Sequence, residues 1–221
     1  MAAPPVVVKR EPGRPVEGTG ARERLLDAAA TLIIERQSID ISLADIAAKS
    51  ALNSALVKYY FGSKTGLLVA LLRRDATRAV AQMEELLALD ISATQKMRLH
   101  VRGILQSYTR SPYLNRLLRD LLHVPEDEVR QDVYRMLVQP VFNCQRHILA
   151  QGVASGEFRT VDHEIFYLAC IGACDQFLQT ERVLCIVNTG EDLQSFRDRY
   201  SAFVIDMVLA SLAPPGRSAP A

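Results

Sequence analysis

Thiol and imidazole side chains recur at helical spacing in the second half of this 221-residue chain. Cys170 and Cys174 are four residues apart, and Cys144 and His147 are three apart, so each pair lies on one face of a helix. Cysteine and histidine at such spacing bind metal ions or carry out redox chemistry. They also occur as small core residues, because free cysteine is among the most buried residue types. One hypothesis is therefore a thiol- or metal-responsive redox protein that uses these four residues, and the other is a plain helical core.

A second group of polar side chains lies in the stretch ALNSALVKYYFGSK, residues 51–64. If this stretch is helical, successive residues are about 100° apart. One side is then apolar, with Leu56, Val57, Tyr60 and Phe61, and the other carries Ser54, Ala55, Lys58 and Tyr59. Small residues near the start of a helix, followed by a cation and a phenol, suit a helix that enters the major groove of DNA. The alternative is a solvated face of an ordinary surface helix.

The larger part of the chain lacks the sequence motifs of enzymes. Residues 76–212 contain no G-x-S-x-G, P-loop, G-x-G-x-x-G or H-E-x-x-H sequence. His100, His123 and His163 each stand alone and form no constellation with other catalytic residue types. We therefore expect neither an enzyme nor a protein with a bound cofactor.

The composition is that of an ordinary globular protein, with 49% hydrophobic and 23% charged residues. A net charge of +1 gives no overall electrostatic argument for nucleic acid, membrane or acidic substrate. Up to residue 75 the chain is mildly basic, with 11 Lys and Arg against 8 Asp and Glu, whereas the remainder has 15 against 17. Cysteines without a disulfide pattern, no apolar signal segment and no long apolar window predict a cytoplasmic protein with no membrane span.

Helical periodicity dominates the sequence and strand signals are nearly absent, so we predict an all-α fold of about nine helices. The predicted helices span residues 21–36, 42–50, 54–61, 64–88, 93–109, 112–122, 125–152, 162–187 and 191–212. Residues 1–20 and the tail 213–221, both rich in proline, are predicted to be disordered. Residues 21–66 then form a small three-helix domain, and residues 67–212 form a larger helical domain.

Several helix ends are marked by capping residues. The predicted N-caps are Ser42, Asn53, Ser92 and Asp162, with Asp45 and Gln95 completing capping boxes after Ser42 and Ser92. Gly62 is expected to end the helix of residues 54–61. Pro140 falls inside a predicted helix and is expected to kink it.

The helices of residues 42–50 and 54–61 are separated only by Ala51, Leu52 and Asn53. Two helices joined by so short a turn, with small residues near their crossing, form a helix-turn-helix. Gly62-Ser63-Lys64 follows directly and places a lysine at the start of another helix, where exposed N–H groups attract phosphate. The combination favours DNA binding over a merely solvated surface.

The segment SLADIAAKSALNSALVKYYFGSKTGLL resembles the DNA-binding domain of the TetR family of transcriptional regulators, and the similarity covers residues 21–72. The resemblance implies that residues 54–61 are the recognition helix and that Ser42 and Lys64 contact phosphates. It also implies that the side chains facing the DNA are those of Asn53, Ser54, Ala55, Lys58 and Tyr59. Two positions depart from the family pattern, since Ala51 stands where many members have glycine and Lys58 where many have tyrosine.

Arg14 lies in the sequence PGRP within the N-terminal arm. A short Gly-Arg-Pro segment in a flexible arm can place its arginine in a narrow A·T minor groove. The alternative is an arm that does not contact DNA. We include Arg14 among the candidate DNA-binding residues.

The larger domain contains more apolar residues than one helical face needs. In EIFYLACIGACDQFLQTERVLCIV, residues 164–187, apolar side chains surround the helix, which must therefore be covered on several sides. The resemblance implies that the last two helices, residues 162–187 and 191–212, pair with those of a second subunit. Such a homodimer presents two recognition helices about 34 Å apart and matches a palindromic operator.

The resemblance further implies a cavity for a small-molecule effector inside the larger domain. Candidate lining residues combine aromatic bulk with a few polar atoms on the middle helices; they are Tyr108, Tyr113, Phe142, His147, Phe166, Cys170 and Phe177. The sequence thus predicts a ligand-responsive regulator, a repressor that a small, largely apolar effector releases from its operator. A structural dimer whose N-terminal domain binds another protein is a further alternative.

Overall fold

The computed structural model describes the backbone of residues 19–187 and 192–215, and the side chains of residues 20–176 and 192–215. Arg14 and most of the two terminal segments expected to be disordered lie outside the described residues, as does the side chain of Phe177. The part that is described contains no strand, and none of its helices is long and apolar enough to cross a membrane.

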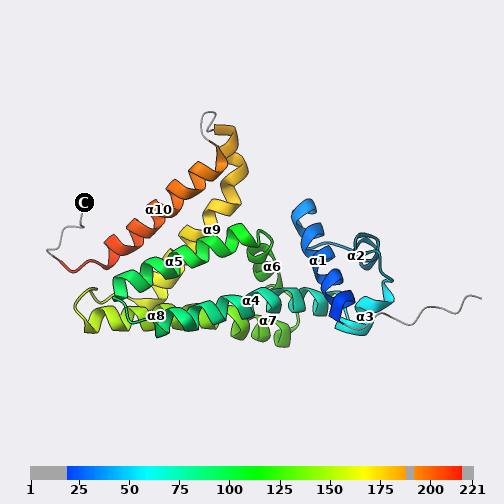
Figure 1. The fold of residues 1–221 in the computed structure, drawn as a ribbon, viewed down its shortest axis with the longest axis horizontal. Coiled ribbons are helices and arrows are strands. Elements are labelled where there is room, and N and C mark those ends of the chain that lie inside the picture. Colours follow the sequence, from blue (N-terminus) through cyan, green and yellow to red (C-terminus); the bar gives the residue numbers. More distant parts are fainter. Residues whose placement is uncertain (1–18, 188–191, 216–221) are drawn as a thin grey trace, which may run out of the picture.

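Helices account for nearly all of the described chain (Figure 1). In chain order they are α1 (Thr19–Arg36), α2 (Leu43–Ser50), α3 (Ala55–Phe61), α4 (Lys64–Ala88), α5 (Ala93–Arg110), α6 (Leu114–Leu121), α7 (Asp127–Val133), the π-helix η1 (Tyr134–Val138), α8 (Gln139–Ala154), α9 (His163–Val187) and α10 (Leu193–Leu212). Because α7, η1 and α8 follow one another without a break, the described residues form nine continuous helical segments. The all-α prediction is confirmed.

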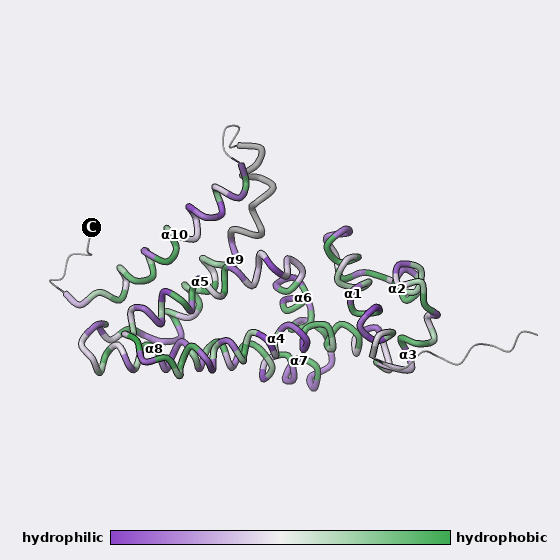
Figure 2. Tube along the Cα trace, in the orientation of Figure 1, coloured by the Kyte–Doolittle hydropathy of each residue, from purple (hydrophilic) through white to green (hydrophobic). Residues whose placement is uncertain are grey.

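The molecule consists of a head, α1 to α3, and a body, α5 to α10, with α4 running from one into the other (Figure 1). A first buried cluster joins the head to α4, α6 and the start of the α7–α8 segment, and its fully buried members include Leu25, Ile46, Val57 and Leu71. Figure 2 shows hydrophobic residues concentrated on α4 where it leaves the head. This cluster continues across residue 67, where the sequence places the domain boundary, so the head and α6 share one core.

A second buried cluster fills the body between α5, α8, α9 and α10. Val101 on α5, Ile148 on α8 and Val204 on α10 are among its members. α10 is polar in its first half and apolar in its second, and the second half supplies its buried members of this cluster, while Tyr200 in the first half packs against it (Figure 2). The body therefore closes around residues that the 3.6-residue period placed on one face of each helix.

The predicted caps form as expected at most helix starts. Ser42 and Asp45 make a complete capping box at α2, and Ser92 and Gln95 make another at α5. Asp162 accepts from the backbone N–H of Ile165 at 3.0 Å, which caps α9. At α3 the helix begins one residue later than predicted. There the flanking residue is Ser54, and the Asn53 side chain accepts from the N–H of Ala55 at 2.8 Å.

The long helix predicted over residues 125–152 is continuous from Asp127 to Ala154 but contains the π-helix η1, which ends two residues before Pro140. Proline has no N–H to donate to the carbonyl four residues earlier, and its ring collides with that carbonyl in an α-helix. A wider turn removes the conflict, and here the N–H of Gln139 bonds to the carbonyl of Tyr134, five residues back. The expected effect of Pro140 thus takes the form of a π turn.

Ala51, which ends α2, has a left-handed backbone with φ 53° and ψ 38°. In this conformation its N–H lies against the carbonyls of Ala47 and Ala48, and the N–H of Leu52 bonds to Ala47 at 3.1 Å. The turn is therefore a glycine-type helix end built without glycine, and the chain tolerates the steric cost of the Cβ atom.

We expect Ala51→Gly to raise the free energy of unfolding by about 0.5–1 kcal/mol, because it removes the left-handed strain and adds a smaller unfolded-state entropy cost. Urea denaturation of both proteins measures the difference. Gly62→Ala is the matched control, since Gly62 has φ 73° and open space around its Cβ position. That variant should lose a similar amount, and an unchanged or lower stability of Ala51→Gly would contradict the assignment of strain.

Candidate DNA-binding surface and effector cavity

The helix-turn-helix is held together by ion pairs as well as by its core. Arg36 at the end of α1 binds both carboxylate oxygens of Asp45 on α2, at 2.8 and 2.6 Å. These bonds, with those from Ser42, hold the pKa of the Asp45 carboxyl well below its usual range. Arg24 on α1 donates to the carbonyl of Ser50 at 2.6 Å, at the other end of α2. Both ends of α2 are therefore fixed to α1, and α3 follows in a defined direction.

The outward face of α3 is the one the sequence predicts. Val57 is fully buried and Leu56, Tyr60 and Phe61 are partly buried, whereas Ser54, Ala55, Lys58 and Tyr59 are exposed. Tyr59 is the extreme case at 79% exposure, with its ring standing edge-on to that of Tyr60 at 4.9 Å between centroids. Lys58 has no ion-pair partner within the described part of the chain. A cation and a phenol thus project together from a two-turn helix.

The two residues expected to contact phosphates are placed differently from each other. Lys64 stands at the start of α4, with its Nζ 3.7 Å from Asp40 Oδ1. The Ser42 hydroxyl donates to Asp45 Oδ2 at 2.6 Å and accepts from the Asp45 N–H at 3.1 Å. Its donor is therefore engaged in the capping box. The ion pair between Lys64 and the exposed loop residue Asp40 is weak, so a DNA phosphate can replace the Asp40 carboxylate.

The body contains a cavity of about 400 Å³ between α4, α5, α6, the η1–α8 segment and α9. Its wall is mostly apolar and includes Met83, Leu86, Ile104, Leu114, Leu118, Leu137, Val141 and Ile171. Exposed residues border it on two helices: Gln82 and Glu85 on α4, and Gln106 and Arg110 on α5. Its volume lies in the range of small-molecule sites.

A buried histidine faces this cavity. His100 on α5 is only 3% exposed, and burial lowers its pKa to about 4, so the ring is neutral near pH 7. Its Nδ1 lies 3.6 Å from Cys144 Sγ, while its Nε2 is buried without a hydrogen-bond partner among the described residues. Asn115 on α6 lines the same cavity, and its buried Nδ2 has no partner in the described part of the chain either. Two residues with an unpaired buried nitrogen therefore belong to a mainly apolar cavity wall.

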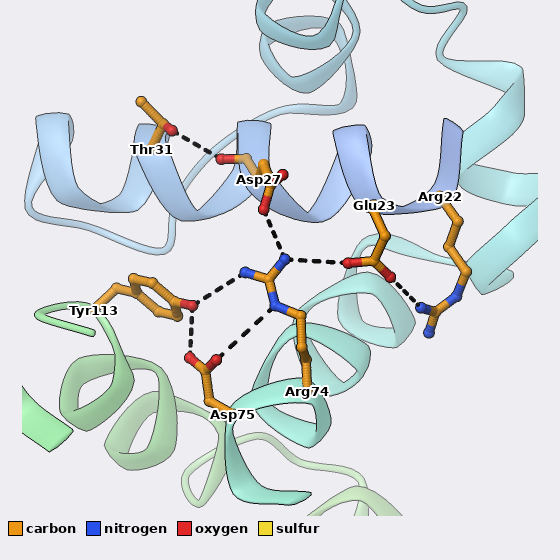
Figure 3. Close-up of polar contacts among 7 residues, drawn as sticks. All are labelled: Arg22, Glu23, Asp27, Thr31, Arg74, Asp75 and Tyr113. Atoms are coloured by element: carbon orange, nitrogen blue, oxygen red, sulfur yellow. Dashed lines mark hydrogen bonds and ion pairs between the residues drawn. The ribbon is translucent and has the colours of Figure 1, made fainter. Parts of the chain in front are cut away.

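Arg74 on α4 joins the head to the body through a cluster of polar side chains (Figure 3). Its Nη1 donates to Asp27 Oδ1 at 2.7 Å and to Glu23 Oε2 at 3.3 Å, both on α1. Its Nη2 donates to Tyr113 Oη at 3.4 Å, and that hydroxyl donates to the buried Asp75 at 2.6 Å. Since Tyr113 directly precedes α6, this Arg74 cluster connects the head with a wall of the cavity.

Comparison with known proteins places both parts of the chain in one family. Residues 25–71 match the family described as "Bacterial regulatory proteins, tetR family", and residues 90–217 match "Tetracyclin repressor-like, C-terminal domain". The chain belongs to the TetR family. It is therefore a DNA-binding transcriptional regulator and not an enzyme.

Individual relatives agree with this assignment. The chain is 32% identical over 148 residues to the HTH-type transcriptional regulator BetI of Brucella melitensis biotype 1, a match that covers 61% of this chain and 74% of the relative. Among solved structures, FadR from Bacillus subtilis in complex with stearoyl-CoA shares the fold at 21% identity and a TM-score of 0.66, over 86% of this chain and 98% of that one. PfmR from Thermus thermophilus shares it at 22% and 0.65, over 86% and 100%.

In this TetR-family body, the cavity wall differs from the predicted one. Of the seven candidates, Tyr108 lines the cavity. Tyr113 instead belongs to the Arg74 cluster. The ring of Phe142 packs against those of His163 and Tyr167, at 4.0 and 5.2 Å between centroids.

The remaining candidates lie elsewhere for equally simple reasons. His147 is exposed because it falls on the outer face of α8, and Phe166 and Cys170 are packed inside the second core cluster. Phe177 lies outside the described side chains. The missed residues His100, Ile104 and Ser107 could have been found, because they share one face of α5 with the predicted Tyr108 and all four line the cavity.

The residues of the thiol or metal hypothesis do not converge. Cys144, Cys170 and Cys174 are buried, whereas His147 is exposed. Burial raises the pKa of the Cys144 thiol to about 11, and contact with Cys170 together with burial also raises that of Cys174. Within the described residues, no three His, Cys, Asp or Glu side chains gather as metal ligands. These thiols are core residues of the TetR-family body.

His100 predicts a specific dependence of stability on pH. Its pKa is about 4 in the folded protein against 6.5 when solvated, so between these values the unfolded chain binds more protons. The free energy of unfolding should therefore fall as pH drops from 6.5 to 4, by roughly 3 kcal/mol from this group. Denaturation of wild type and His100→Leu at several pH values isolates the effect, because the carboxylates of the protein contribute equally to the pH dependence of the free energy of unfolding in both. Parallel pH curves for the two proteins would refute it.

Proposed function

We propose that this regulator is a homodimeric repressor that binds a palindromic operator and is released by a small, largely apolar effector. The observation that carries the proposal is that one helix, α4, belongs both to the head and to the cavity wall. Lys64 starts this helix beside the DNA-facing surface, and Met83 and Leu86 near its other end line the cavity. An effector that displaces the cavity end of α4 therefore changes the position of the head.

The length and packing of α4 support this mechanical role. It has 25 residues, about 37 Å at 1.5 Å per residue. Leu67, Leu71 and Leu72 are fully buried in the core shared with the head. Because packed cores resist gradual deformation, the head moves with the helix as one body. A shift at the cavity thus alters the spacing of two recognition helices in a dimer.

Exposed apolar stripes on the last two helices support the dimer. On α9, Ile165 and Leu168 are 67% and 70% exposed and lie one turn apart. On α10, Phe203 is 65% exposed, and Met207 follows one turn later. Large apolar side chains that gather on adjacent helices mark interaction surfaces. A second copy of the same two helices covers both stripes by two-fold symmetry.

The cavity favours effectors with a hydrocarbon part. Its wall is mainly apolar, and exposed polar residues, among them Gln82, Gln106 and Arg110, border it. Such a site binds an amphipathic molecule with the chain inside and the polar end toward solvent. FadR from Bacillus subtilis, which shares the fold, has a crystal structure in complex with stearoyl-CoA. Acyl compounds are therefore the first class of effectors to test on this protein.

The DNA-facing surface gives a prediction about specificity. Lys64→Ala should weaken binding about equally on selected operator fragments and on random duplex, because a phosphate contact carries no sequence information. Lys58→Ala and Tyr59→Ala should in addition lower the preference for the operator, by about tenfold for one lost base contact. Affinities at fixed salt on both DNAs provide the measurement. Equal losses from all three variants on both DNAs would contradict this division of roles.

The Arg74 cluster gives a prediction about coupling between the two sites. Tyr113→Phe removes the hydroxyl that bonds Asp75 and Arg74 but leaves the cavity wall intact. We expect effector affinity to stay unchanged, while the effector-induced loss of operator affinity shrinks about fivefold, equivalent to one hydrogen bond. Operator titrations with and without acyl-CoA esters of several chain lengths measure the coupling.

Tyr134→Phe is the matched control, since that tyrosine is exposed and lies outside the Arg74 cluster. It should behave like wild type in both assays. If the effector lowered the operator affinity of Tyr113→Phe as much as that of the wild type, the Arg74 cluster would have no role in coupling the two sites. If no acyl compound changed operator affinity in the wild type, the proposed release mechanism would fail for this class of effectors.

A further inference from the structure

Two buried polar atoms of residues in the cavity wall have no hydrogen-bond partner among the described residues. They are Nε2 of His100, whose side chain is 3% exposed, and Nδ2 of Asn115. Leaving a buried polar group unpaired is costly because the group loses its hydrogen bonds to water, and native proteins keep few such groups. An apolar residue at position 100 would avoid this cost. A cavity-lining histidine whose buried Nε2 has no partner among the described residues therefore points to a hydrogen bond that forms only with a ligand.

Cys144 decides which ring nitrogen of His100 carries the proton. Its Sγ lies 3.6 Å from Nδ1, and its thiol stays protonated because burial raises its pKa to about 11. Sulfur is a weak acceptor and the imidazole nitrogen a good one, so the S–H donates to Nδ1. A neutral ring that accepts at Nδ1 holds its proton on Nε2. The unpaired Nε2 of this cavity-lining histidine is thus an N–H donor.

The surroundings of His100 also set the charge of the group it can bind. The ring is neutral, as its lowered pKa requires, and Ile104 and Tyr108 continue the cavity wall along the same helix. The charged residues that line the cavity, Glu85 and Arg110, are both exposed at its border. The buried cation one turn away, Lys96, donates to the carbonyl of Leu87 and does not line the cavity. An ionised carboxylate next to His100 would therefore be buried without a cation in the cavity wall, which is costly. A neutral oxygen acceptor carries no such cost.

We propose that the effector carries a neutral carbonyl oxygen, as in an ester, thioester or ketone, that accepts a hydrogen bond from Nε2–H of His100, with Asn115 as a second polar contact. This inference rests on the proposed effector function and names the chemical class that the same cavity selects. The hydrocarbon part of the ligand packs against Met83, Leu86 and Ile104. His100 is thus the residue that distinguishes an acyl compound from a plain hydrocarbon of the same shape.

A pair of isosteric probes tests the carbonyl directly. 2-Undecanone and 2-methyl-1-undecene differ only in an oxygen that replaces a CH₂ group. Their dissociation constants follow from displacement of the neutral fluorophore N-phenyl-1-naphthylamine from the full-length protein. The ratio of the two constants, compared between wild type and His100→Leu, cancels the different hydration of the free probes. We expect the preference for the ketone to be about fivefold to tenfold greater in the wild type.

His100→Gln is the matched control variant, because its Nε2 can place a donor close to that of the histidine. It should keep most of the preference for the ketone. Without effector, His100→Leu should be at least as stable as the wild type near pH 7, since it removes an unpaired polar atom. Nitrogen-15 NMR of the imidazole provides an independent readout, in which Nε2 carries the proton and shifts when the ketone binds but not when the alkene binds.

The same ratio of dissociation constants in wild type and His100→Leu would overturn the inference, as would a proton on Nδ1. Failure of both probes to displace the fluorophore from the wild type would overturn it too. Operator titrations with the same probes separate this inference from the proposed function. If both probes release operator DNA with no ketone preference, the sensing function stands and the role of His100 fails. If the ketone preference appears but operator affinity never changes, the carbonyl site stands and the release mechanism fails.

Discussion

The structure depends on α4 being a single helix that belongs to two cores. Its first half contributes Leu67, Leu71 and Leu72 to the core of the head, and its second half forms one wall of the cavity. Bending the helix within either core costs free energy, because close-packed side chains have few alternative arrangements. The head therefore has no position independent of the body. In the proposed function, the same continuity that makes the head rigid also transmits to it what fills the cavity.

Buried polar groups occur at two places along this arrangement, in the Arg74 cluster between the head and the body and in the cavity wall. The Arg74 cluster pairs Asp75 with Tyr113, and it ties α1 to the segment before α6. His100 and Asn115 are the opposite case, because each has a buried atom that no described residue pairs with. A satisfied network specifies one arrangement, and an unsatisfied group stores a cost that a ligand can remove. In the proposed mechanism, the first defines the state without effector, and the second contributes to the binding energy of the effector.

The sequence predicted what depends on neighbours along the chain. Helix periods, the capping boxes at Ser42 and Ser92, and the outward face of α3 follow from spacing alone, and the structure agrees with all of them. The cavity wall depends instead on which helices meet and at what depth. Phe142 and Tyr113 have suitable chemistry, but packing directs one to an aromatic cluster and the other to Arg74. One-dimensional patterns cannot distinguish such residues from those that line a void.

The net charge of the chain does not indicate DNA binding, and the ion pairs of the head explain why. Arg36 is paired with Asp45 and Lys49 with Glu35, so much of the positive charge in α1 and α2 serves to hold the helices together. The cation on the recognition face that no carboxylate neutralises is Lys58, within the described residues. Affinity for a duplex then depends less on bulk charge than on a few well-placed contacts. A single subunit offers few of them, which is why the proposed homodimer, with two copies held at a fixed spacing, suits the selection of an operator.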